Sequence, residues 1–207
     1  MTPRPAQPPE QAEAKKFAII QATLDAIVAR GPSAVRLGDV AKAVGMSIGT
    51  VQYYFESRDD LLAQAFSFQT ATVLLHLEEM AKQGDDPRGR MARYRLHNAF
   101  AAVQGVGMHE QRSRIWLELV TAARTDEGLQ NCVDAVFAGW RKLFRTIVDD
   151  GLERHEFGLF DLSATEVVDT FIAIIDGFDL ATVAGHGPDP RTMTRILIET
   201  ADRLLEG

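Results

Sequence analysis

The chain of 207 residues has one cysteine, Cys132, and no long uncharged apolar run. A single cysteine cannot form an internal disulfide or a thiolate metal site, and its place on an apolar helix face favours a small core residue. No run approaches the roughly 18–20 residues that a membrane helix needs, and the N-terminus lacks the apolar centre of a secretory signal. These absences predict a cytoplasmic protein without a membrane partner.

Positive charge is also scarce, because 22 Lys and Arg stand against 29 Asp and Glu, a net charge of −7. Taken over the whole chain, this balance argues against a nucleic-acid binder, since phosphate attracts Lys and Arg. The deficit is uneven, however. Residues 1–60 carry seven basic and seven acidic groups, whereas residues 61–207 carry 15 and 22. The N-terminal part is therefore neutral, and the objection applies only to the remainder.

Proline is absent from residues 33–86 and 88–187, which favours a helical protein because proline interrupts helices beyond their first turn. Apolar residues recur at three-and-four spacing, and no alternating strand pattern appears. The sequence predicts an all-α fold that follows a disordered tail over residues 1–10. About nine helices are expected, at 11–30, 37–44, 48–54, 58–83, 88–104, 109–124, 126–154, 164–184 and 190–206.

Several expected helix starts carry capping signals. Ser163 and Glu166 have the spacing of a capping box, in which a hydroxyl and a carboxylate bind free backbone N–H groups of the first turn. Asp86-Pro87 and Asp189-Pro190 place a capping residue before a first-turn proline. These signals support the proposed helix boundaries.

Residues 36–58 form the most informative segment. Val40, Ala41 and Val44 share one apolar face, Gly45 then stops the helix, and Ser47 is suited to cap the next one. In this next helix we expect Ile48, Val51 and Phe55 to share the buried face. Two short helices joined by a tight glycine turn indicate a helix-turn-helix. Its outward face carries neutral donors of the kind that bind DNA phosphates and bases, namely Gly49, Thr50, Gln52, Tyr53 and Tyr54.

This segment resembles the DNA-binding domain of the TetR family of transcriptional regulators. The resemblance lies in the run from Asp39-Val-Ala through Gly45, Ser47, Gly49-Thr50 and Tyr53-Tyr54-Phe55 to Leu61-Leu62. It implies an all-α homodimer with a helix-turn-helix DNA-binding domain over 11–57 and a helical effector-binding and dimerisation domain over 58–207. The C-terminal half also resembles the subgroup typified by the betaine-synthesis repressor, through Trp116-Leu-Glu-Leu119, Ala122-Ala-Arg124, Trp140-Arg141 and Ile175-Asp-Gly-Phe178.

The resemblance implies that Ser47, Gly49, Thr50, Gln52, Tyr53 and Tyr54 face DNA. Arg58 stands where the family usually has a lysine that pairs with phosphate, although it is equally interpreted as a surface charge at a helix start. Two positions depart from the family. Val35-Arg36 replaces the usual Thr or Ser before the second helix, so Arg36 is expected to supply that phosphate contact. Gln52 replaces a common Tyr, so the base preference does not carry over.

Five residues are candidates for an effector pocket: His97, Trp116, Phe137, Trp140 and Asp176. For the aromatic residues, ordinary core packing is the stronger alternative. Asp176 is unusual because it interrupts an apolar run from Phe171 to Phe178. Its carboxylate is expected either to pair with a cationic effector or, as we favour, to serve packing or the dimer.

These features predict a ligand-responsive transcriptional regulator, most simply a repressor that a small molecule of unknown identity releases from palindromic double-stranded operator DNA. The alternative is a helical small-molecule sensor that dimerises but does not bind DNA. An enzyme is not supported, because no phosphate-binding glycine loop, nucleophile elbow or spaced acid pair is present. The five histidines are scattered without zinc spacing, so neither a metal nor another cofactor is expected.

Overall fold

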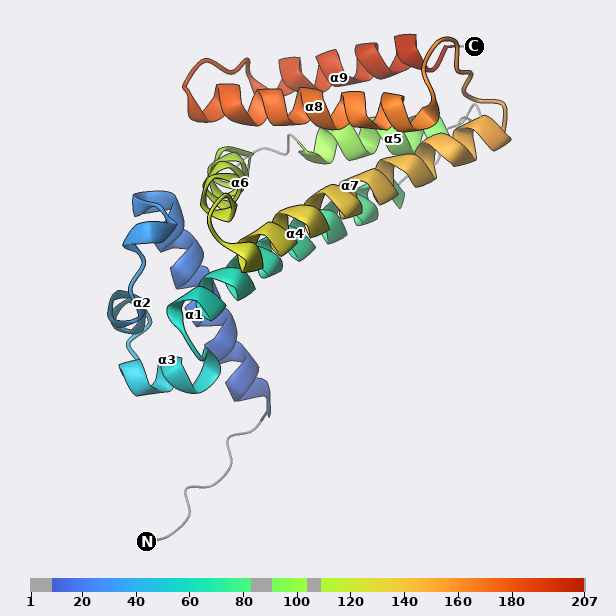
Figure 1. The fold of residues 1–207 in the computed structure, drawn as a ribbon. Coiled ribbons are helices and arrows are strands. Elements are labelled where there is room, and N and C mark those ends of the chain that lie inside the picture. The colour runs from blue at the N-terminus through green and yellow to red at the C-terminus, as the bar shows by residue number, and fades with distance from the viewer. Residues whose placement is uncertain (1–8, 83–90, 104–108, 207) are drawn as a thin grey trace, which may run out of the picture.

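The computed structural model describes residues 9–82, 91–103 and 109–206, and within these ranges it is built of helices (Figure 1). The described part contains nine α-helices, as expected, so the all-α prediction is confirmed. They are α1 (Pro9–Arg30), α2 (Leu37–Ala43), α3 (Ile48–Tyr54), α4 (Arg58–Lys82), α5 (Met91–Val103), α6 (His109–Ala123), α7 (Glu127–Glu153), α8 (Ala164–Val183) and α9 (Pro190–Leu204), with a short 3-10 helix η1 at Pro32–Ala34.

The observed boundaries differ little from the expected ones. Helix α1 begins at Pro9, inside the predicted tail, because proline is compatible with the first turn of a helix. Residues 1–8 of that tail and the Asp86-Pro87 helix start lie outside the described residues. The other capping signals are confirmed. Ser163 and Glu166 form a complete capping box, and the Asp189 side chain accepts hydrogen bonds from the first-turn N–H groups of Arg191 and Thr192.

The three N-terminal helices surround a small apolar core that the first half of α4 completes. Ile27 from α1, Val51 from α3 and Leu61 from α4 are fully buried in it. Gly45 separates α2 from α3 with a φ of 66°, a left-handed conformation that favours glycine and confirms the predicted helix stop. The glycine turn therefore sets the direction in which α3 leaves α2.

Helix α4 connects the N-terminal helices to the rest of the molecule, and it runs alongside α7 (Figure 1). Its first half packs into the N-terminal core through residues such as Phe66, whereas Leu77 and Ala81 pack into a second core. The aromatic centre of that second core comprises Phe100, Phe144 and Phe171, with ring centroids 5.2–6.1 Å apart. One helix is thus shared by both apolar cores.

Helices α8 and α9 form an antiparallel pair at the end of the molecule far from α3, and α6 lies between this pair and the N-terminal helices (Figure 1). Helix α7 buries the predicted apolar stripe, which includes Cys132 and Trp140. None of the described helices is long and apolar enough to cross a membrane. The arrangement places α6 in contact with α1, η1, α7 and α8 at once.

Candidate functional site

The outward face of α3 is the first candidate site. Ser47 caps this helix, because its Oγ accepts a hydrogen bond from the Thr50 N–H at 3.1 Å and the two hydroxyls lie 2.9 Å apart. Gly49 and Gln52 are exposed, and Tyr53 is 81% exposed. Tyr54 is half-buried and packs against the N-terminal core, so it presents less of its ring to solvent than the sequence suggested.

The two arginines that were expected to bind phosphate have different surroundings in the structure. Arg36 is exposed at the N-cap of α2 and makes no capping hydrogen bond, so its guanidinium is available to a ligand. Arg58 instead donates from Nε to the Val35 carbonyl at 2.9 Å and from Nη2 to the Pro32 carbonyl at 2.6 Å, and it pairs with Asp59. These bonds fasten α4 to the turn after α1, a contact over more than 20 residues that sequence spacing did not indicate.

The expected burial of Ile48 is wrong. Val51 and Phe55 are completely buried, but Ile48 is 51% exposed on the first turn of α3. The reason is that α3 begins at Ile48, beyond the edge of the small core that Val51 and Phe55 fill. The outward face of α3 therefore contains an apolar side chain beside its polar ones.

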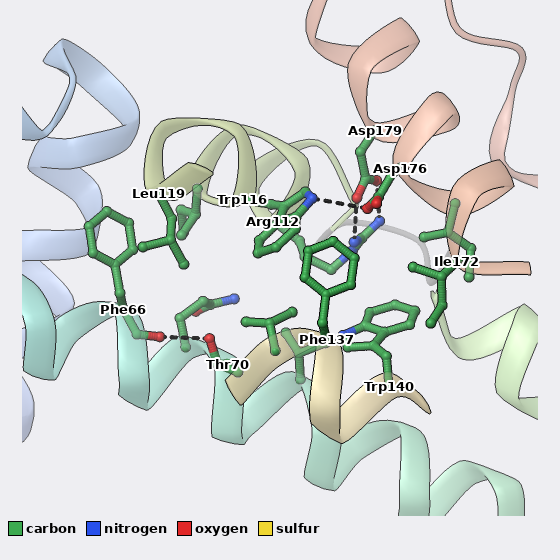
Figure 2. Close-up of a pocket in the computed structure, with 15 residues that line it drawn as sticks. Phe66, Thr70, Arg112, Trp116, Leu119, Phe137, Trp140, Ile172, Asp176 and Asp179 are labelled. Atoms are coloured by element: carbon green, nitrogen blue, oxygen red, sulfur yellow. Dashed lines mark hydrogen bonds and ion pairs between the residues drawn. The ribbon is translucent and has the colours of Figure 1, made fainter. Parts of the chain in front are cut away.

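The second candidate site is a pocket enclosed by four helices (Figure 2). It contains about 580 Å³ of space, its open mouth included. The walls are mainly apolar or aromatic, and the charged groups gather on the sides formed by α6 and α8. The lining residues are Phe66, Gln69, Thr70 and Val73 of α4, Arg112, Ile115, Trp116 and Leu119 of α6, Val136, Phe137 and Trp140 of α7, and Ile172, Ile175, Asp176 and Asp179 of α8.

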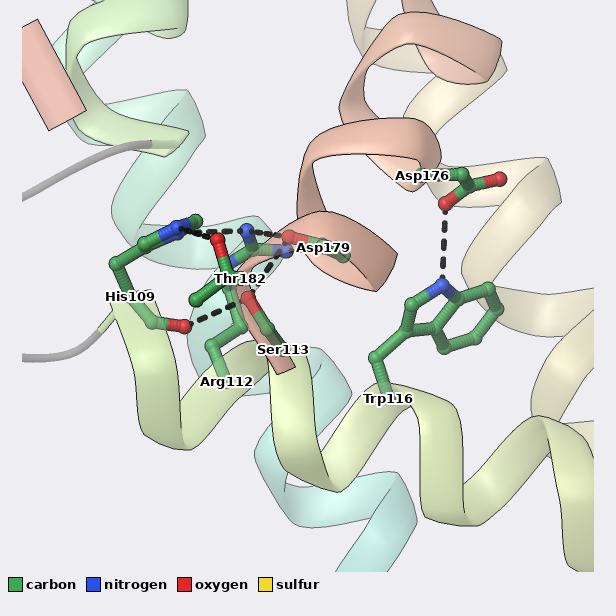
Figure 3. A network of polar contacts seen from close by, with 7 residues as sticks. All are labelled: His109, Arg112, Ser113, Trp116, Asp176, Asp179 and Thr182. Atoms are coloured by element: carbon green, nitrogen blue, oxygen red, sulfur yellow. Dashed lines mark hydrogen bonds and ion pairs between the residues drawn. The ribbon is translucent and has the colours of Figure 1, made fainter. Parts of the chain in front are cut away.

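A buried ion pair joins α6 to α8 beside this pocket (Figure 3). The guanidinium of Arg112 donates to both carboxylate oxygens of Asp179, which is 1% exposed, and Ser113 Oγ donates to the same carboxylate at 2.9 Å. This two-point geometry is the strong form of an arginine–carboxylate contact. Arg112 Nε is buried and has no hydrogen-bond partner among the described residues.

His109 extends this network toward the end of α8. Burial, followed by the charge of Arg112, lowers the pKa of His109 below its ordinary value, so the ring is neutral at pH 7. Its Nδ1 accepts from Arg112 Nη2 at 3.4 Å, which leaves the proton on Nε2 to donate to Thr182 Oγ1 at 2.8 Å. The network therefore adds no positive charge besides that of Arg112.

Asp176 lies about one turn before Asp179 and lines the pocket (Figure 2). Trp116 Nε1 donates to its Oδ1 at 3.0 Å. Burial and the nearby charge of Asp179 raise the pKa of Asp176 to about 6, against the opposing effects of the Trp116 hydrogen bond and Arg112. The pocket thus holds two carboxylates and one guanidinium, and the guanidinium is already paired with Asp179. Asp176 has no cation of its own there.

Four of the five predicted pocket residues come together, namely Trp116, Phe137, Trp140 and Asp176, and the rings of Trp116 and Phe137 meet edge to face. His97 does not line this pocket. It lies on α5, where its Nε2 is 3.0 Å from Asp202 Oδ1 on α9. Arg112 and Asp179 were missed, although helical spacing from Trp116 and Asp176 places them on the same faces.

Helix α6 joins the pocket to the N-terminal helices. Ile115 and Leu119 line the pocket and also belong to the apolar core formed by α1 to α4. On the same helix, Glu118 lies against the turn after α1, with its carboxylate 3.5 Å from the position that a Cβ on Gly31 would occupy. Helix α6 is therefore in contact with both the pocket and the N-terminal core.

Two family models match the chain, one in each half. Residues 19–65 match the family described as bacterial regulatory proteins, tetR family, and residues 91–206 match the family described as BetI-type transcriptional repressor, C-terminal. The HTH-type transcriptional regulator PksA of Bacillus subtilis (strain 168) is 24% identical over 172 residues, which cover 81% of this chain and 78% of that protein. Within the described part of the chain, no group of three His, Cys, Asp or Glu is arranged to hold a metal ion.

Two solved structures show the same fold. A TetR-family regulator from Rhodococcus sp. superimposes with a TM-score of 0.79 at 22% identity, covering 94% of this chain and 100% of that one. A transcriptional regulator from Saccharomonospora viridis, solved in complex with choline, has a TM-score of 0.78 at 21% identity and covers 93% and 98% of the two chains. A helix-turn-helix followed by helices that enclose a pocket is the architecture of a ligand-responsive transcriptional regulator. The chain belongs to the TetR family, with a C-terminal half of the BetI type.

The first prediction separates a structural role of Arg58 from a phosphate contact. We expect Arg58→Gln to lower the free energy of unfolding by about 1 kcal/mol, because the shorter amide side chain cannot replace the planar donors to two carbonyls. The salt dependence of DNA binding should not change, whereas Arg36→Ala should reduce its slope by about one for each bound subunit. Urea unfolding and DNA titration at several salt concentrations measure the two effects. A salt slope that Arg58→Gln reduces as Arg36→Ala does contradicts the structural role.

The second prediction concerns Asp176 and pH. Because its folded pKa of about 6 exceeds the ordinary 3.8, the folded state binds this proton more tightly, and stability falls as pH rises between these values. At pH 7 we expect Asp176→Asn to be the more stable protein by on the order of 1 kcal/mol, a value reduced for the partial exposure of the group. The difference should vanish near pH 4 in thermal unfolding. Asp169→Asn, on the exposed side of α8, is the control and should not show this pattern.

Proposed function

We propose that this chain is a repressor that binds operator DNA through α3 and leaves it when a small molecule occupies the pocket between α4, α6, α7 and α8. The observation that carries the proposal is the sharing of Ile115 and Leu119 between the pocket and the N-terminal core. We further propose the division expected from the sequence, with DNA binding over residues 11–57 and effector binding and dimerisation over 58–207. The coupling between the two sites is then reciprocal, and such couplings are typically 5- to 150-fold.

The charge of the chain suits a DNA contact made mainly by neutral groups. Arg36, at the N-cap of α2, and Lys42, within α2, are both exposed. The hydroxyls, amide and phenols of α3 supply further donors to phosphates and bases. Few phosphates are neutralised in each subunit, so the salt slope should be modest for a DNA-binding dimer. The acidic remainder discourages contact with DNA elsewhere.

A second copy of the chain is the proposed partner at the outer face of α8. Leu180 is 60% exposed and Val183 is 38% exposed there, and the position of a Cβ on Gly177 meets no atom within 4 Å. Large exposed apolar residues beside a position without a side chain allow two α8 helices to approach closely. A two-fold dimer presents two α3 helices to DNA, which requires a palindromic operator.

The third prediction tests DNA recognition. Selection from random duplexes with the full-length protein should enrich a palindrome whose half-sites lie about one helical turn apart. We expect Gln52→Ala to weaken binding to this duplex by about 5- to 150-fold, since a side-chain amide contact with a base typically contributes about 1–3 kcal/mol of discrimination. Gln130→Ala, which changes the same residue type on the surface of α7, should bind as the wild type does. Failure to enrich any sequence contradicts the proposal and favours a sensor without DNA function.

The pocket chemistry supports an organic cation with an apolar body as the effector. Trp116, Phe137 and Trp140 offer aromatic faces, which attract cations, and Asp176 supplies a carboxylate that no cation of the pocket balances. Burial of a neutral molecule leaves that carboxylate in an apolar site, whereas a cation compensates for it. The choline complex of the regulator from Saccharomonospora viridis is consistent with this class of ligand and supplies a first probe.

The fourth prediction uses two probes of nearly equal shape. Choline and 3,3-dimethylbutan-1-ol differ only in a charged nitrogen and a neutral carbon, so a preference for choline isolates the charge. We expect choline, or the larger benzyltrimethylammonium, to bind, to change the fluorescence of Trp116 and Trp140, which both line the pocket, and to release the selected duplex. Asp176→Asn should abolish the preference, and Asp169→Asn should retain it.

Acidification provides a second test of the same contact. Both cations keep their charge at every pH, so only the protein titrates. With a pKa of about 6 for Asp176, binding should be about tenfold weaker at pH 5 than at pH 7.5, because a proton occupies the carboxylate. Equal affinity for the charged and neutral probes, or binding that does not change with pH, contradicts the cationic effector class but leaves DNA recognition intact.

A further inference from the structure

The exposed Ile48 side chain on α3 has no role in the functions derived above. Its neighbours in the three-and-four pattern, Val51 and Phe55, are fully buried, yet Ile48 is 51% exposed. Half of this large apolar side chain is therefore left in water on the helix that faces DNA. The contribution of Ile48 to the apolar core is correspondingly small. A contact with a molecule outside the protein is therefore the role that we consider for this side chain.

Ile48 is held in a defined position. Its Cδ1 lies 3.5 Å from the position that a Cβ on Gly38 would occupy, an ordinary van der Waals distance, so the side chain rests on the first turn of α2. A β-branched side chain on a helix also has few rotamers. A DNA contact made by this side chain would therefore need little ordering on binding.

Gln52 follows Ile48 by four residues, so both side chains lie on one stripe of α3, and both are exposed. The hydroxyls of Ser47 and Thr50, on the same helix end, hydrogen-bond to each other. In the major groove an amide matches adenine, whereas an apolar group matches the 5-methyl group of thymine. Four residues rise about 6 Å along a helix, and base pairs are stacked about 3.4 Å apart.

We propose that Ile48 is a base-recognising residue that contacts the 5-methyl group of a thymine, within about two base-pair steps of the base pair that Gln52 contacts. This inference rests on the proposed DNA binding through α3. It predicts that one thymine of each half-site is distinguished from uracil, which has the same hydrogen-bonding groups and lacks only the methyl group. Because the contact is uncharged, it contributes specificity without changing the salt dependence.

The fifth prediction uses the duplex obtained by selection and replaces each thymine of a half-site in turn with deoxyuridine. At one position we expect the wild-type protein to bind about three- to fivefold more weakly, the usual effect of one buried methyl or methylene group. Ile48→Ala should bind the original duplex more weakly by a similar factor. On the uracil duplex it should lose nothing further, because both changes remove the same contact.

Two controls keep this test specific. Leu75→Ala removes a similarly exposed apolar side chain from α4 and should leave DNA affinity unchanged. Ile48→Ala should unfold at nearly the wild-type temperature, since the side chain is half-exposed. The inference is overturned if every uracil penalty persists undiminished in Ile48→Ala, or if the selected half-site shows no penalty at any thymine. Absence of any selected sequence instead contradicts the proposed DNA binding itself.

Discussion

The ion pair between Arg112 and Asp179 is the interaction on which the pocket depends. It joins α6 to α8 inside the protein, and removal of either partner would leave a buried charge, which typically costs about 3–5 kcal/mol. Because the guanidinium is committed to Asp179 by two hydrogen bonds, it cannot also neutralise Asp176. Burial is the main cause of the raised pKa of Asp176, and the pairing leaves this buried carboxylate without a cation of its own. The affinity for a cation that we infer depends on both conditions.

Helix α6 connects the charged side of the pocket to the N-terminal helices. Arg112 and Trp116 of this helix contact Asp179 and Asp176, whereas Ile115 and Leu119 pack against the core of the N-terminal helices. A well-packed core does not deform continuously, so a shift of α6 must be met by a shift of α1 or α4. Helix α4 also belongs to both cores. In the dimer that we propose, these two helices connect the pocket to the spacing of the α3 helices.

Much of the fold follows from local sequence. Capping residues such as Ser163 and Asp189, the glycine turn at Gly45 and the apolar stripe of α7 each act within a few residues, and each was predicted correctly. The errors arose where distant segments meet. Ile48 has core spacing but lies beyond the edge of the core, and His97 faces α9 rather than the pocket. Helical periodicity determines which residues share a face, but not what that face contacts.

The sequence by itself determined the helices, the helix-turn-helix and the family, because caps, turns and apolar periodicity act over short distances. It also identified Asp176 as an unusual carboxylate. Only the tertiary structure showed the surroundings of that carboxylate and the partners of Arg58. Charges interact through space, and the partner of a charge is set by helix packing over separations such as the 67 residues between Arg112 and Asp179. The electrostatic balance of the pocket therefore exists only after α6 and α8 have been brought together.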